Sequence, residues 1–109
     1  MNVRLYLWQR ATAALMVPLV LIHLAVILYV SRQGMTAADI LSRTHGSVVW
    51  AAYYGLFVVA ASIHAGIGVR NVLVEWSPFR ESSIETFAIL FGQLLLWTGL
   101  WAVYVLVLA

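Results

Sequence analysis

The chain has 109 residues, of which 64% are hydrophobic and only 9% are charged, and its formal net charge is +2. Soluble domains average roughly 45–50% apolar and 25% charged residues, and a soluble chain this short cannot bury so much apolar surface. The composition therefore indicates that lipid is the solvent, and six scattered basic residues are not the clustered patch of a nucleic-acid-binding protein.

Three charge-free runs follow one another along the chain: Ala11–Val30, Thr44–Val69 and Thr86–Ala109. Each is at least as long as the roughly 20 residues that cross a bilayer as a helix. Backbone in lipid must be hydrogen-bonded within helices or a closed barrel, and long runs without alternation indicate helices. We predict an all-α membrane protein, one three-helix domain over residues 1–109, with spans at about 11–30, 46–69 and 86–108 and a loop at 31–43.

The arginines predict the topology. Four of them lie on the side shared by the N-terminus and the 70–85 connection, whereas the other side carries only Arg32 and Arg43. The positive-inside rule then places the N-terminus in the cytoplasm, or in the matrix of a mitochondrion, and the C-terminus outside. We expect a multi-pass protein of the cell inner membrane, or of the mitochondrial inner membrane in a eukaryote.

The three histidines lie within or beside the first two spans. His23 lies inside the first span, where it could hydrogen-bond to a neighbouring helix, ligate a haem or contact a haem propionate. His45 lies at the outer mouth of the second span and is interpreted as an interfacial polar residue.

His64 is the strongest candidate site, because an ionisable group inside a span is costly unless it is used. Helical spacing places it on one face with residues 57, 60, 61 and 68, a face rich in small side chains that could receive a flat haem. Arg70 follows towards the charged side, where arginine suits haem propionates. The alternative is a structural histidine bonded to an adjacent helix, with small neighbours that permit close packing.

A second constellation is expected at the cytoplasmic interface. Arg10 begins the first span with Thr12 just inside it, and Glu75 and Trp76 close the second span. A quinone headgroup needs hydrogen-bond donors at its carbonyls and a proton supply, which these four residue types provide. The alternative is a set of ordinary polar anchors at helix ends.

Cysteine is absent from the chain. This excludes disulfides, an iron–sulfur cluster bound by this chain and the covalent attachment of a c-type haem. No glycine-rich phosphate loop or dinucleotide fingerprint is present, so bound FAD is not expected either. Any haem would be held non-covalently.

The segment His64-x-x-x-Gly68-x-Arg70, followed by Glu75, resembles the haem-ligating second helix of the cytochrome b membrane anchor subunits of succinate dehydrogenase and fumarate reductase. The opening Trp8-Gln9-Arg10-Ala11-Thr12-Ala13-Ala14 resembles the start of their first helix. The resemblance extends over the whole chain, although its specific motifs occupy about two dozen residues.

The resemblance implies that His64 is an axial ligand of haem b, with Arg70 near a propionate and Arg10 at a propionate or the quinone. Glu75 would match an acid beside the quinone pocket, with Trp76 where the family usually has tyrosine. Gln9 replaces a frequent histidine, and Tyr6 stands where a serine is common. The family's anchors occur as a larger and a smaller subunit, and this chain combines features of both. Its spacing from His64 to Arg70 resembles the larger subunit, and its short N-terminus resembles the smaller one.

The implied function is a non-flavin membrane subunit of succinate:quinone or quinol:fumarate oxidoreductase, not catalytic towards succinate on its own. Its expected partners are a flavoprotein, an iron–sulfur protein and a second anchor subunit that supplies the other haem ligand, with His23 as the alternative ligand. The substrate would be ubiquinone or menaquinone. The alternatives are a haem-free anchor of the same complex and a non-redox membrane assembly or accessory protein.

Overall fold

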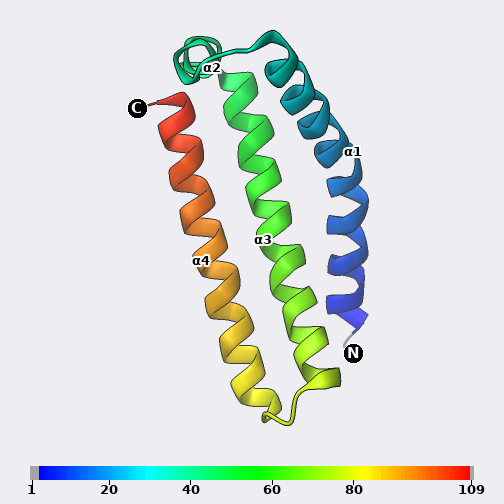
Figure 1. Cartoon of the computed structure of the whole chain (residues 1–109). Helices are drawn as coiled ribbons and strands as arrows, with labels where there is room; N and C mark the ends of the chain where they lie inside the picture. Colours follow the sequence, from blue (N-terminus) through cyan, green and yellow to red (C-terminus); the bar gives the residue numbers. More distant parts are fainter. Residues whose placement is uncertain (1–2, 109) are drawn as a thin grey trace.

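The computed structural model describes residues 3–108 of the chain, and it forms helices and short connections (Figure 1). The helices are α1 (Val3–Gln33), α2 (Ala37–Thr44), α3 (Val48–Trp76) and α4 (Glu81–Val107). The predicted all-helical architecture with three spans is confirmed, because α1, α3 and α4 are long and apolar enough to cross a membrane. Ala109, the last residue of the third charge-free run, lies outside the described residues.

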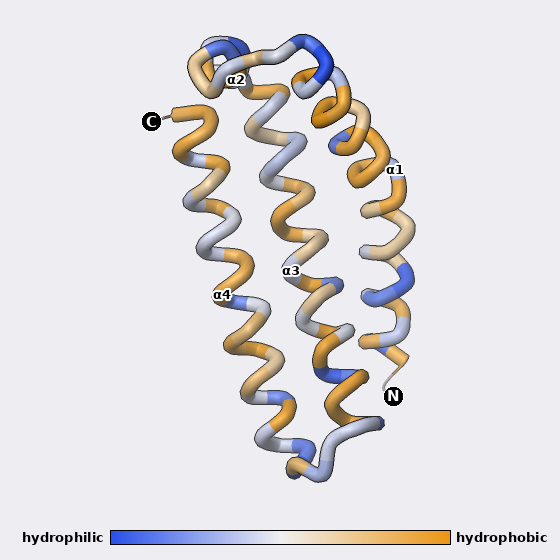
Figure 2. Tube along the Cα trace, viewed as in Figure 1, coloured by the Kyte–Doolittle hydropathy of each residue, from blue (hydrophilic) through white to orange (hydrophobic). Residues whose placement is uncertain are grey.

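The three long helices lie side by side, with α3 in the middle and in contact with both neighbours (Figure 1). The start of α1 and the α3–α4 connection lie at one end, called here the Arg70 end. Helix α2 and the end of α4 lie at the other, called the α2 end. Hydrophilic residues gather near both ends and interrupt the apolar helices at a few positions between them (Figure 2). This arrangement leaves α3 partly open on two opposite faces.

The expectation of a loop over residues 31–43 is wrong, because α2 forms there. Its N-terminus is a capping box: the Asp39 amide donates to Thr36 Oγ1 over 3.2 Å, and the Thr36 amide donates to Asp39 Oδ2 over 3.0 Å. The hydrogen bonds from the Thr36 backbone and side chain lower the pKa of the Asp39 carboxyl. A threonine followed three residues later by an acid is a helix-start signal that the sequence does carry.

Helix α1 contacts α3 through residues at alternating intervals of four and three. These positions are less exposed than their neighbours: Leu5, Gln9, Thr12, Met16, Leu19, His23, Val26 and Val30. Such spacing is typical of helices that pack at a shallow crossing angle. A polar contact joins the two helices at the middle of this row, where the Tyr53 hydroxyl donates to the Leu19 carbonyl.

Tyr53→Phe is expected to destabilise the folded chain by about 1 kcal/mol, the typical net contribution of one such hydrogen bond. Tyr54→Phe is the matched control, because within residues 3–108 the Tyr54 hydroxyl makes no hydrogen bond. Thermal unfolding of the solubilised protein followed by circular dichroism compares the two variants. An equal loss in both would contradict the proposed contribution of the Tyr53 hydroxyl.

The α3–α4 contact is made by small residues. Ser62 and Gly66 of α3 face Ala88 and Gly92 of α4, and a Cβ added at Gly92 would lie 3.6 Å from the Ser62 carbonyl oxygen. Small residues four apart let membrane helices approach closely. At Gly99 the space is filled by a side chain of α3, because an added Cβ would lie 2.6 Å from Val58 Cγ1.

Candidate functional site

The central polar contact of the bundle joins His64 of α3 to Thr12 of α1. His64 Nδ1 lies 3.3 Å from Thr12 Oγ1, and Thr12 is buried. The Thr12 hydroxyl lies 2.8 Å from the Trp8 carbonyl oxygen and 3.1 Å from that of Gln9, and its single proton is donated to one of these carbonyls. With that proton on a carbonyl, the Thr12 oxygen accepts from His64, and this hydrogen-bond network assigns the imidazole proton to Nδ1.

This assignment leaves His64 Nε2 with its lone pair. Among the described residues, no hydrogen bond engages Nε2. A histidine that ligates a metal characteristically donates its other ring N–H to a fixed acceptor, which sets both tautomer and ring orientation. The Thr12–His64 pair therefore has the hydrogen-bonding arrangement of a metal-ligating histidine.

One turn towards the Arg70 end, Gln9 of α1 lies against Gly68 of α3. A Cβ added at Gly68 would be 3.4 Å from Gln9 Nε2, so the amide packs against the glycine at van der Waals distance. Gln9 Oε1 is buried and has no hydrogen-bond partner among residues 3–108. A buried unpaired acceptor is costly, and it leaves a position where a donor would be stabilised.

The small-residue face predicted on α3 is turned towards α1. Phe57 lies on the His23 ring with centroids 5.5 Å apart, His64 meets Thr12, and Gly68 meets Gln9. Ala60, between them, is only 2% exposed. Both the packing and the haem-binding interpretation thus describe part of this face. Its small residues permit close packing with α1, and His64 among them keeps Nε2 free of hydrogen bonds to residues 3–108.

Arg70 lies in an ionic cluster that joins α3 to α4. Its guanidinium is 3.2 Å from Glu81 Oε1 and 3.2 Å from Glu85 Oε1, and it also donates to Asn71 Oδ1. The Arg70 side chain is 14% exposed. The cluster borders a hollow of about 510 Å³ that Glu75 also lines. Sequence reasoning missed both glutamates, although they lie just before the third predicted span.

The four residues proposed for a quinone headgroup are not brought together in this chain. Thr12 is buried on His64, whereas Arg10 is exposed and its guanidinium lies over the Tyr6 ring, 5.7 Å from the centroid. Glu75 is exposed at the edge of the hollow, and Trp76 is 83% exposed at the end of α3. Arg10 and Trp76 are accessible to other molecules.

The other two histidines lie away from His64. The His23 ring packs against Tyr54 and Phe57, and its buried Nδ1 has no partner among the described side chains. Those two aromatics precede His64 by seven and ten residues, which is about 10–15 Å along the helix at roughly 1.5 Å per residue. His45 is exposed and follows the last residue of α2, with its amide bonded to the Leu41 carbonyl.

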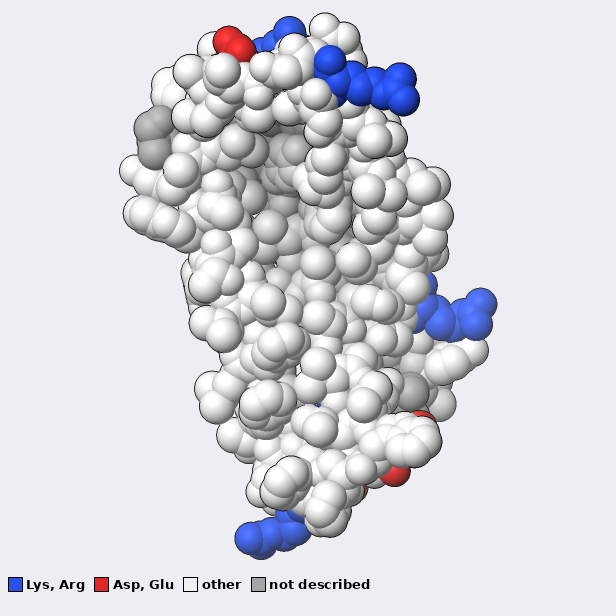
Figure 3. All heavy atoms as spheres, in the orientation of Figure 1, with Lys and Arg blue, Asp and Glu red and all other residues white. Residues whose placement is uncertain are grey.

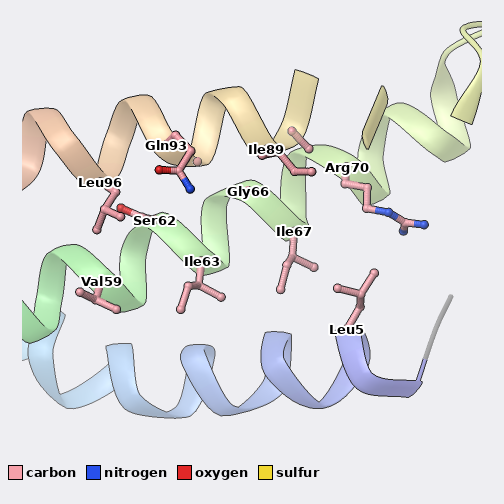
Figure 4. A pocket seen from close by; sticks show the side chains of 12 residues that line it. Leu5, Val59, Ser62, Ile63, Gly66, Ile67, Arg70, Ile89, Gln93 and Leu96 are labelled. Carbon is pink, nitrogen blue, oxygen red and sulfur yellow. The ribbon is translucent and has the colours of Figure 1, made fainter. Parts of the chain in front are cut away.

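The face of α3 that lines neither the His64 nor the His23 contact carries an open groove of about 390 Å³ (Figure 4). Apolar side chains from α1, α3 and α4 line most of it: Leu5, Val59, Ile63, Ile67, Ile89 and Leu96. Arg70 lies at one end, and Ser62 and Gln93 are its other polar side chains. The groove suits an apolar chain or an apolar helix.

Within residues 3–108, no group of three or more His, Asp or Glu side chains is placed to hold a metal ion directly. The candidate centre in this chain is accordingly a single oriented imidazole inside the span region.

These features define the class of protein: a small multi-pass helical membrane protein whose central helix holds an oriented histidine. Residues 2–108 match the family described as the succinate dehydrogenase/fumarate reductase transmembrane subunit. The chain belongs to this family. Searches found no significant match among curated proteins and none among solved structures.

Proposed function

We propose that the chain is a haem-binding membrane anchor of a succinate:quinone or quinol:fumarate oxidoreductase. It would hold a flavoprotein and an iron–sulfur protein at the membrane and help to form the quinone site, without acting on succinate itself. Family membership supports the complex. The Thr12–His64 hydrogen bond is the observation that carries the haem assignment, because it leaves Nε2 available to iron.

The residues present fit a haem b held by His64. The ring is oriented from the Nδ1 side by Thr12, and Nε2 makes no hydrogen bond to residues 3–108. A bound haem would carry single electrons between the iron–sulfur partner and quinone. Arg70 is the proposed propionate partner, and a propionate would have to share its guanidinium with Glu81 and Glu85.

We propose that the second axial ligand comes from another anchor subunit. For both residues to hold one haem, His23 would have to bring its ring beside the His64 ring. Its ring instead packs on Tyr54 and Phe57, two to three turns from His64. This separation favours a ligand from a partner subunit over His23.

For the quinone site, we propose that Arg10, Glu75 and Trp76 contribute from this chain and that partner subunits complete the pocket. All three are exposed near the Arg70 end. Arg10 and the Trp76 indole can donate to a quinone carbonyl, and Glu75 can exchange protons with water. The contact with His64 favours a positioning role for Thr12 over a direct contact with quinone.

The test of this function is purification of the assembled complex through a tag on this chain. The proposal predicts that a flavoprotein and an iron–sulfur protein co-purify, and that the complex reduces quinone with succinate. Isolation of the chain without a flavoprotein would instead support an assembly or accessory role.

Thr12→Val is expected to weaken haem retention by about tenfold, the lower end of the effect of removing an outer-shell partner of a metal ligand. It should also shift the haem midpoint potential, because the imidazole loses the acceptor for its Nδ1 proton. Thr12→Ser retains that acceptor and should restore both quantities. Redox titration of the purified complexes measures the shift, and equal potentials in Thr12→Val and wild type would refute the positioning role.

A further inference from the structure

The α2 end of the molecule contains an apolar cavity that is separate from the His64 site. Its volume is about 440 Å³, and its walls come from α1, α2 and α3, with Leu106 of α4. The lining includes Ile22, Val26, Met35, Ile40, Trp50 and Tyr54. Trp50 and Tyr54 precede His64 by four and nearly three turns of α3, so the cavity lies well away from that histidine.

The cavity continues along one face of the bundle. A neighbouring hollow of about 380 Å³ shares Tyr54 and Leu106 with it and is lined by residues of α1, α3 and α4. Figure 3 shows this face hollowed below the α2 end, with arginine side chains above the hollow. The combined shape is an apolar furrow that begins at the end of the spanning helices and runs towards their middle.

Arg43 is the charged residue that lines the cavity. Its guanidinium lies over the Tyr29 ring, 5.9 Å from the centroid. Asp39 lies one turn earlier and interacts electrostatically with Arg43. Its carboxylate, however, accepts the hydrogen bond from the Thr36 amide in the capping box. Within the described part of the chain, Arg43 makes no ion pair with a carboxylate.

Arg43 lies in α2, directly after the end of the candidate spanning helix α1, and the end of a spanning helix meets the lipid headgroups. Guanidinium groups bind phosphate oxygens through paired, charge-assisted hydrogen bonds. An apolar furrow beneath such a group matches an acyl chain, and aromatic residues such as Tyr29 and Trp50 are typical of the interface. Because Arg43 makes no ion pair with a carboxylate of residues 3–108, its positive charge favours an anionic headgroup.

We propose that this cavity is a binding site for one phospholipid, preferentially anionic, whose phosphate is held by Arg43 while one acyl chain lies in the furrow. The site is independent of the haem and quinone proposals. Its occupation would fix α2 against α1 and α3.

The experiment compares the purified complex with variants by native mass spectrometry after graded delipidation. Wild type should retain one phospholipid per copy of this chain, and Arg43→Gln should retain about tenfold less, the equivalent of losing one charge-assisted hydrogen bond. Arg32→Gln is the matched control, since Arg32 does not line the cavity, and it should behave as wild type. Equal retention in Arg43→Gln and wild type would overturn the proposal.

Rebinding identifies the occupant. Phosphatidylglycerol should restore the bound lipid more effectively than phosphatidylcholine, and inorganic phosphate alone should not bind. Ala25→Trp fills the cavity from α1 and should block rebinding, with unchanged thermal stability showing that this variant is folded. Rebinding unaffected by Ala25→Trp, or binding of free phosphate, would contradict the proposal.

A partner helix is the competing occupant. Because the chain has no cysteine, an Ala25→Cys variant carries a thiol at one position of this chain only, at the cavity. Cross-linking of this position to lipid supports the proposal, and cross-linking to a partner subunit overturns it.

Discussion

His64→Ala is expected to remove the b-type haem absorbance from the assembled complex. The substitution deletes Nε2, the candidate iron ligand of a ring that is oriented by a hydrogen bond to the Thr12 hydroxyl. Because the haem would be held non-covalently, loss of this ligand should remove it or distort its spectrum. Dithionite-reduced minus oxidised spectra of the purified complexes measure the change, and succinate oxidation with an artificial dye should continue in the flavoprotein.

The matched controls are the other two histidines. His45→Ala should leave the spectrum unchanged, because His45 is exposed at the end of α2. His23→Ala should also preserve the haem, because its ring packs on Tyr54 and Phe57 away from His64. An unchanged spectrum in an intact His64→Ala complex would reject the ligand assignment, and loss of haem in His23→Ala alone would transfer the assignment to His23.

Gly99→Ala is expected to destabilise the chain by about 1–3 kcal/mol, as overpacking of a tight contact does. The new Cβ would lie 2.6 Å from Val58 Cγ1 and 3.0 Å from Val58 Cγ2. Valine in a helix is nearly confined to one rotamer, so the side chain cannot turn away and the helices must separate. Thermal unfolding of the solubilised chain, or of the complex, measures the loss.

Two further variants isolate the cause. Gly55→Ala places a Cβ in open space on α3 and should be neutral or stabilising by up to about 1 kcal/mol, since alanine favours helix over glycine. Val58→Ala combined with Gly99→Ala should recover most of the lost stability. If the double variant is no more stable than Gly99→Ala, a clash with Val58 does not cause the loss of stability in Gly99→Ala.

The spans could be predicted from sequence because lipid imposes a simple constraint: length and lack of charge suffice to identify α1, α3 and α4. Helix α2 was missed because it is short and mixes polar with apolar residues. Its signal is local, the Thr36 and Asp39 pair, and is invisible to a search for long apolar runs.

The site was predicted only in part. His64 could be selected from its cost in lipid, but its partner Thr12 is 52 residues away and had been assigned to a quinone pocket. That pairing depends on the rotation of α1 against α3, which periodicity alone does not determine. Arg70 was similarly expected to face a cofactor, whereas a turn at residues 77–80 brings Glu81 and Glu85 onto it.

The haem content of the purified wild-type complex tests the central claim most directly. A pyridine haemochrome assay should find haem b, one per copy of this chain, and acid-acetone should extract it because the chain has no cysteine for covalent attachment. A complex that contains all its subunits and reduces quinone with succinate, yet contains no haem, would contradict the assignment of His64 as a haem ligand.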